Sequence, residues 1–438
     1  MKKLKTDPAL RQQIAAVLKL SLPAILTQIT TIAMQYIDSA MVGALGAKAS
    51  AAIGLVATCT WLFNGVTYAV SAGFSVQVAH CIGAQRDDSA RAVVKHGLIS
   101  ALLVSVLLCI LGALISRPLP AWLGGEADIR ADATAYFLVF ALYLPFSQIN
   151  SLTSSFLQCC GDMVTPSILN AAMCLLDVLF NALFIPRFGV LGAGIGTALA
   201  CVTVSLAMLW CCCVRNKHLR LHRGEAGRIL GLGIPAGIQH MIFAVANLFI
   251  QVGINSFDST VVSGNSAAVN VDNVIYNVMA AFYTACSTFM GQNWGAGNKD
   301  RMMKSYYISL GYSFLIAAVL GVGFLLCGEP FLYIFTNDAD VVAAGMERMQ
   351  IMCFSYCISA FMDCTIAACR GIGRSFVPTI IVILGSCVFR VVWVYTLFAH
   401  FHTIPSLYLL YPFSWILTAA AEILYFIRCC RRLRIAQA

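Results

Sequence analysis

Twelve long apolar segments run along this chain of 438 residues, and they constrain its fold more than any other feature. An α-helix needs about 20 apolar residues to cross a bilayer, and a lipid-exposed backbone must satisfy its own hydrogen bonds. The segments are residues 14–43, 50–79, 92–116, 131–160, 163–186, 190–214, 229–255, 266–292, 304–328, 341–369, 375–399 and 405–427. We therefore expect an all-α integral membrane protein with twelve spanning helices in the lipid bilayer.

The charges support this interpretation and exclude a nucleic-acid partner. Only 11% of the residues are charged, against about 25% in soluble proteins. The net charge of +9 comes from basic residues that are concentrated in every second connecting segment, as positive-inside bias predicts. The other connecting segments hold only Lys48, Arg117, Arg130, Arg187 and Arg348. Both termini are therefore expected in the cytoplasm. The nineteen cysteines include no C-x-x-C pair and indicate no disulfide framework.

Short motifs recur at one constant distance along the chain. Leu-Pro-Ala at 22–24 returns as Ile-Pro-Ala at 234–236, Ile-Gly-Ala at 82–84 as Trp-Gly-Ala at 294–296, and Gly161 with Pro166 as Gly373 with Pro378. Each pair is 212 residues apart, and six helices separate the copies. An even number of helices leaves both halves in the same orientation, which predicts a parallel repeat about the membrane normal. The expected lobes are residues 1–214 and 229–438, joined by a basic cytoplasmic linker at 215–228.

The helix expected over 14–43 carries a polar face. Gln28, Thr31, Gln35 and Asp38 follow steps of three, four and three, so they share one side of a helix. An acid inside a membrane helix is by default a functional candidate, although Asp38 could also cap or pin neighbouring helices. Pro23, near the start of this segment, is the expected hinge.

The helix expected over 163–186 repeats this pattern. Its polar face consists of Asn170, Cys174, Asp177 and Asn181. Asp38 and Asp177 both fall in the outer half of the membrane and could share one cavity, while the alternative is that Asp177 and Asn181 only pack helices together. The 212-residue offset places Ile250 and Phe389 opposite the two acids, so ion coupling is expected in the first lobe alone.

Amides and aromatic rings dominate the two helices that follow the linker. The expected substrate surface consists of His240, Asn247, Gln251, Asn273, Tyr276, Asn277 and Tyr283. Stacking and cation–π contacts demand little exact geometry and so suit varied ligands. The alternative is amide hydrogen bonding between helices, which is common in membrane bundles. Arg390 is the arginine expected deep in the membrane, and Asp272, also in the outer half, is its expected structural partner.

Five motifs follow one another along the chain: Leu-Pro…Ile-Asp-Ser…Val-Gly-Ala-Leu-Gly in the first segment, Ile-Gly-Ala-Gln at 82–85, Phe-Gly-Val-Leu-Gly-Ala-Gly-Ile-Gly-Thr at 188–197, Gly-Gln-Asn-Trp-Gly-Ala-Gly at 291–297 and Cys-Arg-Gly-Ile-Gly-Arg-Ser at 369–375. Together and in this order, they make the whole chain resemble the MATE transporters, the multidrug and toxic compound extrusion family, and most of all their bacterial DinF-like branch. The resemblance implies two six-helix lobes, a central cleft, and export of organic, often cationic, compounds against a proton or sodium gradient.

The resemblance also implies a coupling site in the first lobe. Asp38 and Thr197 match the family's aspartate and threonine, whereas Asp177 and Asn181 stand where the family usually has asparagine and aspartate, so that pair is exchanged. Gln35 completes the expected set. Sodium-linked members carry a glutamate on the seventh helix, and residues 229–255 contain no acid. We therefore expect proton coupling, with Asp38 and Asp177 acting as one unit that holds a proton near neutral pH.

The expected function is antiport: export of small organic, cationic or amphiphilic compounds in exchange for protons, without a cofactor. The expected setting is the bacterial plasma membrane, and the expected state is a monomer. The alternatives are a dedicated exporter or flippase of one metabolite or lipid-linked precursor, and sodium-coupled antiport. No H-E-x-x-H, G-x-S-x-G or paired metal-ligand motif occurs, so an enzyme is not expected.

Overall fold

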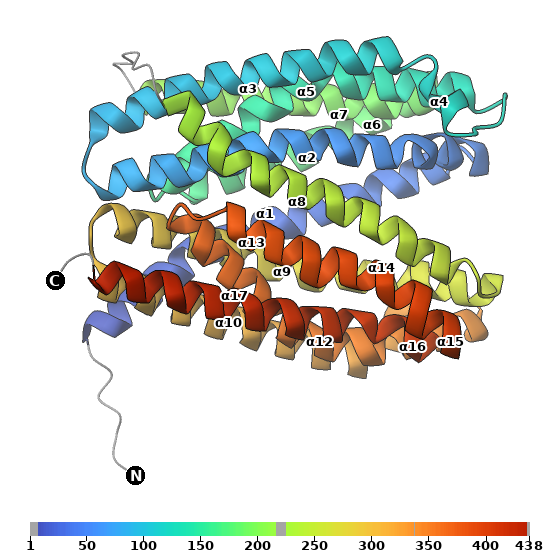
Figure 1. Ribbon diagram of the computed structural model, residues 1–438. Coiled ribbons are helices and arrows are strands. Elements are labelled where there is room, and N and C mark those ends of the chain that lie inside the picture. Colours follow the sequence, from blue (N-terminus) through green and yellow to red (C-terminus); the bar gives the residue numbers. More distant parts are fainter. Residues whose placement is uncertain (1–7, 216–224, 337, 436–438) are drawn as a thin grey trace. The chain divides into compact units, whose positions relative to one another are not determined.

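A computed structural model describes residues 8–215, 225–336 and 338–435, and every regular element within them is a helix. The first half holds α1 (Pro8–Gly43), α2 (Ala47–Gly83), α3 (Asp87–Ile115), α4 (Leu119–Trp122), α5 (Arg130–Cys159), α6 (Val164–Phe188) and α7 (Val190–Arg215). The second half holds α8 (Glu225–Ile254), α9 (Ser259–Gly295), α10 (Lys299–Leu326), α11 (Gly328–Leu332), α12 (Ala339–Gly371), α13 (Phe376–Val382), α14 (Phe389–Trp393), α15 (Ala399–Phe401), α16 (Ile404–Tyr408) and α17 (Leu410–Ile435) (Figure 1). Two π-helical turns, η1 (Ile383–Val388) and η2 (Val394–Phe398), flank α14.

The described residues contain nine helices that are long and apolar enough to cross a membrane. A tenth is α2 if its two parts, which meet at a bend of 42°, count as one span. The two other long helices are α1, with 36 residues, and α9, with 37. Helix α9 is long enough but is not among the apolar spans, because asparagines and an aspartate interrupt its apolar residues. Each of the twelve expected segments therefore has a long helical stretch.

The chain divides into two compact units. One runs from Pro23 to His240, and the other combines the chain up to Leu22 with the chain from Met241 onward. The divisions therefore fall inside α1 and inside α8. The expected lobe limits stay a prediction, and most of the expected linker, residues 216–224, lies outside the described residues.

Aromatic and aliphatic side chains fill the unit that runs from Pro23 to His240. One cluster surrounds Phe137, Phe140 and Leu144 of α5, where Phe63 of α2 meets Phe137 edge to face with ring centroids 5.7 Å apart. A second cluster joins Phe74 of α2 to residues of α3, α5 and α7. These contacts position α5 and α7, which carry residues close to the candidate site.

In the other unit, α12 packs against α9, α10 and α17 around one large cluster of buried side chains. Glycines allow α9 and α12 to approach backbone to backbone: a Cβ on Gly264 would lie 2.6 Å from the carbonyl oxygen of Val341. Small residues serve this purpose at many interfaces between membrane helices. The close approach also brings the polar side chains of α9 and α12 within reach of each other.

Candidate functional site

Three polar residues from two helices meet in the unit that runs from Pro23 to His240. The Nδ2 atom of Asn181 donates to Oδ1 of Asp38 at 2.8 Å and to Oδ2 of Asp177 at 3.2 Å. Asp38 comes from α1, whereas Asp177 and Asn181 lie one turn apart on α6. Asp177 and Asn181 are buried, with 0% and 1% of their surfaces exposed. One amide therefore links the two acids that were expected to share a site.

The carboxylates of Asp38 and Asp177 have more hydrogen-bond acceptors than Asn181 can satisfy. Asn181 supplies one amide group to two carboxylates, and Oδ1 of Asp177 has no hydrogen-bond partner among the described residues. A buried carboxylate without enough donors is costly when ionised, and two neighbouring carboxylates cannot both ionise cheaply. The group is therefore suited to taking up one proton.

A glycine on α7 allows Asn181 to sit where it does. A Cβ at Gly196 would lie 2.1 Å from Oδ1 of Asn181, so only a glycine leaves room for this amide. Thr197 follows on the same helix and is half-buried. No hydrogen bond joins its hydroxyl to either acid within the described residues, so its expected part in the group stays a prediction.

Two tyrosines of α5 accompany the acids, and sequence reasoning missed them. Tyr136 and Tyr143 lie close enough to Asp38 and Asp177 to interact with them electrostatically. Their spacing of seven residues places them on one face of α5, and this was the available signal. Their rings add low-dielectric surroundings, which strengthen any charge effect at the acids.

The remaining residues of the polar face on α1 lie apart from this group. Gln35 is exposed, and no hydrogen bond connects it with the acids in the described chain.

Pro23 lies inside α1, and its carbonyl accepts hydrogen bonds from Oγ1 of Thr27 at 3.2 Å and from Oγ of Ser167 at 2.6 Å. The expected hinge residue is thus tied to α6, the helix that carries Asp177.

The expected substrate surface divides into side chains with different surroundings. Asn247, Asn273 and Tyr276 are exposed, and Nδ2 of Asn277 donates to the carbonyl of Asn273 at 2.7 Å. Tyr283 is buried in the core cluster, with 8% of its surface exposed. Nε2 of Gln251 donates to Oδ1 of Asn255 at 2.8 Å, and the side chain of His240 lies outside the described residues.

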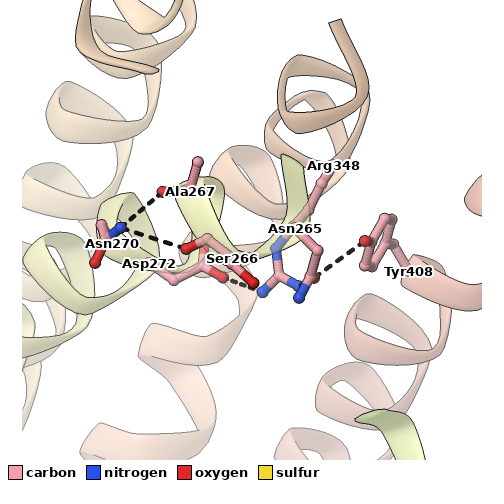
Figure 2. A network of polar contacts seen from close by, with 7 residues as sticks. All are labelled: Asn265, Ser266, Ala267, Asn270, Asp272, Arg348 and Tyr408. Carbon is pink, nitrogen blue, oxygen red and sulfur yellow. Dashed lines mark hydrogen bonds and ion pairs between the residues drawn. The ribbon is translucent and has the colours of Figure 1, made fainter. Parts of the chain in front are cut away.

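The expected ion pair between Asp272 and Arg390 is wrong. Figure 2 shows that Asp272 of α9 pairs with Arg348 of α12, which also donates to Asn265. The hydroxyl of Tyr408 donates to the same Asn265 oxygen at 3.0 Å. Contrary to the expectation from the sequence, Arg348 is therefore not in an outer connecting segment, because α12 starts at Ala339 and buries it.

Arg390 has different partners. Its Nε donates to Oγ of Ser414 at 3.1 Å, and its guanidinium lies 4.6 Å from the ring centroid of Tyr411. The rings of Phe243 and Trp415 are also within 6 Å. Aromatic faces can stabilise a desolvated cation, and this is how Arg390 is accommodated.

Long apolar helices that bring two acids and an amide together are typical of a membrane transporter, and comparison with known proteins identifies the family. The MatE family model matches residues 23–183 and again residues 235–396. The two matches begin 212 residues apart, which is the offset of the sequence repeat. The chain therefore belongs to the MATE family of multi-pass membrane transporters, and it is not an enzyme.

Similar proteins and structures extend over most of the chain. A probable multidrug resistance protein NorM of Thermotoga maritima is 24% identical over 396 residues, covering 86% of this chain and 83% of the relative. An FAD transporter of Shewanella oneidensis is 21% identical over 338 residues, covering 74% and 75%.

Two solved structures have the same fold. A transporter of the MOP superfamily from Pyrococcus furiosus has a TM-score of 0.91 at 20% identity, over 98% of this chain and 99% of that one. A Vibrio cholerae MATE transporter has a TM-score of 0.91 at 17% identity, over 97% and 99%. The expected fold, twelve helices in two six-helix lobes related by a parallel repeat, is confirmed.

Proposed function

We propose that this protein is an antiporter that exports small organic compounds, cationic or amphiphilic, in exchange for protons. The observation that carries the proposal is the pair of hydrogen bonds from Asn181 to Asp38 and Asp177. A site with two acids and one bridging amide changes its charge when it binds a proton, and a transporter can couple that change to its conformation. Two relatives are named probable multidrug resistance proteins, and this supports organic compounds as the cargo.

In the proposed cycle, Asp38 and Asp177 take up one proton from the outside. Protonation removes a buried negative charge and lets α1 shift near Pro23, so that the lobe closes on its site. Closure disfavours bound substrate, and linkage then requires that substrate binding favours proton release. Both termini would lie in the cytoplasm of a bacterial cell, and a single chain would complete the cycle because both acids and the amide belong to it.

Protons fit this site better than sodium. Sodium needs several fixed oxygen ligands, whereas the amide nitrogen of Asn181 occupies the space between the two carboxylates. Helix α8 also carries no acid beyond Glu225 at its first residue.

A test uses purified protein in proteoliposomes loaded with a fluorescent organic cation. Proton and sodium gradients are imposed separately, with protein-free liposomes as the control. We expect a pH gradient to drive transport in sodium-free buffer and a sodium gradient alone to drive none. Sodium-dependent transport that persists with the pH gradient collapsed would overturn proton coupling.

A dedicated exporter of one metabolite is the second candidate, because one relative is named an FAD transporter. Expression in a drug-sensitive bacterium separates the two. A broad exporter lowers the potency of several unrelated dyes and drugs, whereas a dedicated exporter protects against none of them.

A further inference from the structure

Another buried acid has no hydrogen bond within the described residues, and it lies in the half of the chain where no coupling residue is expected. Glu422 of α17 has 0% of its surface exposed, and neither carboxylate oxygen has a hydrogen-bond partner among the described residues. It occupies a buried stripe of α17 at steps of four, together with Ser414, Thr418 and Phe426. Its side chain therefore points into the packed bundle and away from lipid.

The surroundings of Glu422 contain one charged residue that interacts with it electrostatically. This is Arg370, in the last turn of α12, while Cys369 lies next to it. Helix α17 packs against α12, α13, η1, α14 and α16. The other buried titratable groups on these elements and on the neighbouring α10 are Tyr306, Arg348, Cys353, Tyr356, Cys364, Cys387, Arg390 and Tyr408, and Asp363 is half-buried.

Asp363 makes a useful contrast with Glu422. The Oγ of Ser359 donates to Oδ2 of Asp363 at 2.7 Å, so that carboxylate has a donor on its own helix. Glu422 has none. An ionised carboxylate in such a site lacks both water and donors, whereas a neutral carboxylic acid carries no net charge and leaves only an uncharged O–H group and its acceptors unmet. The packing around Glu422 therefore suits the neutral acid.

We propose that Glu422 is a second proton-binding site, which is neutral in the conformation described here and pairs with Arg370 when it ionises. Loss of the proton would create a buried negative charge beside an existing positive one. Attraction between the two would draw α17 towards the end of α12, so the proton on Glu422 would control the contact of these two helices. Residue 210, which the 212-residue offset places opposite Glu422, is Trp210. The site is thus specific to the second half of the chain.

This inference goes beyond the proposed function, which uses only acids of α1 and α6, and its test needs no transport. The thermal unfolding of wild-type protein and Glu422→Gln in detergent is measured from about pH 6 to about pH 9. If the folded state holds this proton more tightly than the unfolded state, the folded protein binds more protons than the unfolded protein in this pH range, so its stability falls as pH rises. Glutamine cannot lose a proton, so the Tm of Glu422→Gln should exceed that of wild type by a margin that grows with pH.

The matched control is Glu329→Gln, the same change at an exposed glutamate of α11, which should follow the wild-type curve at every pH. Parallel curves for wild type and Glu422→Gln would overturn the proposal, as would a Gln variant that loses stability equally at all pH values. If Glu422→Gln does not fold, Glu422→Met takes its place, because an unbranched apolar side chain fits a site built for a neutral acid. Failure of both variants to fold would also overturn it.

Discussion

Two polar groups, one in each half of the chain, each contain a buried asparagine but differ in their balance of charge. Asn181 bridges two carboxylates, Asp38 and Asp177. Asn265 instead accepts from a guanidinium, Arg348, which itself pairs with a carboxylate. The first group therefore joins two acids through an amide, and the second joins an acid to a base.

This difference predicts different behaviour on titration. A buried acid and base that pair with each other can both keep their charges, and breaking the pair leaves one charge stranded. Two acids that share one amide cannot both stay charged at low cost, so the occupancy of a proton decides their state. The group around Asn265 joins α9 and α12 by charge, whereas the proposed function requires the group around Asn181 to gain and lose a proton.

The largest expected effect is on transport, at the acid pair. Asp38→Asn should abolish gradient-driven efflux while substrate binding stays measurable, because the fold does not depend on a charge there. Asp177→Asn should do the same, and the double variant should be no worse than either single one. Transport rates in proteoliposomes and equilibrium binding of the fluorescent cation measure the two properties. Partial losses that multiply in the double variant would show that the acids act independently.

The next largest effect is on stability, at the acid–base pair. Arg348→Met leaves Asp272 buried and unpaired and should cost about 3–5 kcal/mol. The double variant with Asp272→Leu removes the stranded charge and should recover much of this loss, while Tyr408 can still donate to Asn265. Unfolding in detergent with increasing denaturant provides the measurement. If the two single losses simply add, Asp272 and Arg348 do not act as a pair.

A smaller effect is expected next to Asn181. Gly196→Ala places a methyl group 2.1 Å from Oδ1 of Asn181, so the amide must move and its bonds to the acids must lengthen. Transport should fall in part and its pH dependence should shift, with the protein still folded. Gly194→Ala on the same helix is the matched control, because its Cβ would meet only side-chain atoms at 3.4 Å or more. Equal effects from both variants would argue against a role for the position of Asn181.

The smallest effect is expected at an exposed ion pair outside the membrane. Lys48 contacts Asp128 at 2.6 Å, and this hydrogen bond holds the pKa of the Asp128 carboxyl below its usual range. A lowered pKa means that the contribution to stability is present above the unfolded pKa and is lost as pH falls through the folded pKa. Both side chains are open to solvent, so Asp128→Asn should leave Tm nearly unchanged at neutral pH. A clear loss of Tm at neutral pH would show that charge pairs stabilise this protein even in water.

The sequence predicted which residues share a helix face, because this follows from periodicity. It did not predict contacts that depend on how deep in the helical bundle a residue lies. Steps of three and four residues placed Asp38, Asp177 and Asn181 on helix faces, and the structure brings these residues together. Arg348 was missed because a charge near the end of an apolar segment can lie in a loop or inside the bundle, and only the position of the helix start decides between them. Glu422 was also missed, although it lies within the apolar segment 405–427, and an acid in such a segment is by default a functional candidate.

The π-helical turn η1 has a consequence for how the two halves of this chain diverged. Position 389, the counterpart of Asp177 in the 212-residue repeat, follows directly after η1, whereas α6 reaches Asp177 as a regular α-helix. A wider turn rotates every later residue around the helix axis relative to its counterpart. An acid that arose at position 389 by a single mutation would therefore start on a different face from Asp177. A single substitution at position 389 would therefore not reproduce the arrangement that α6 gives to Asp177, and an acid of the second half would have to stand at another position.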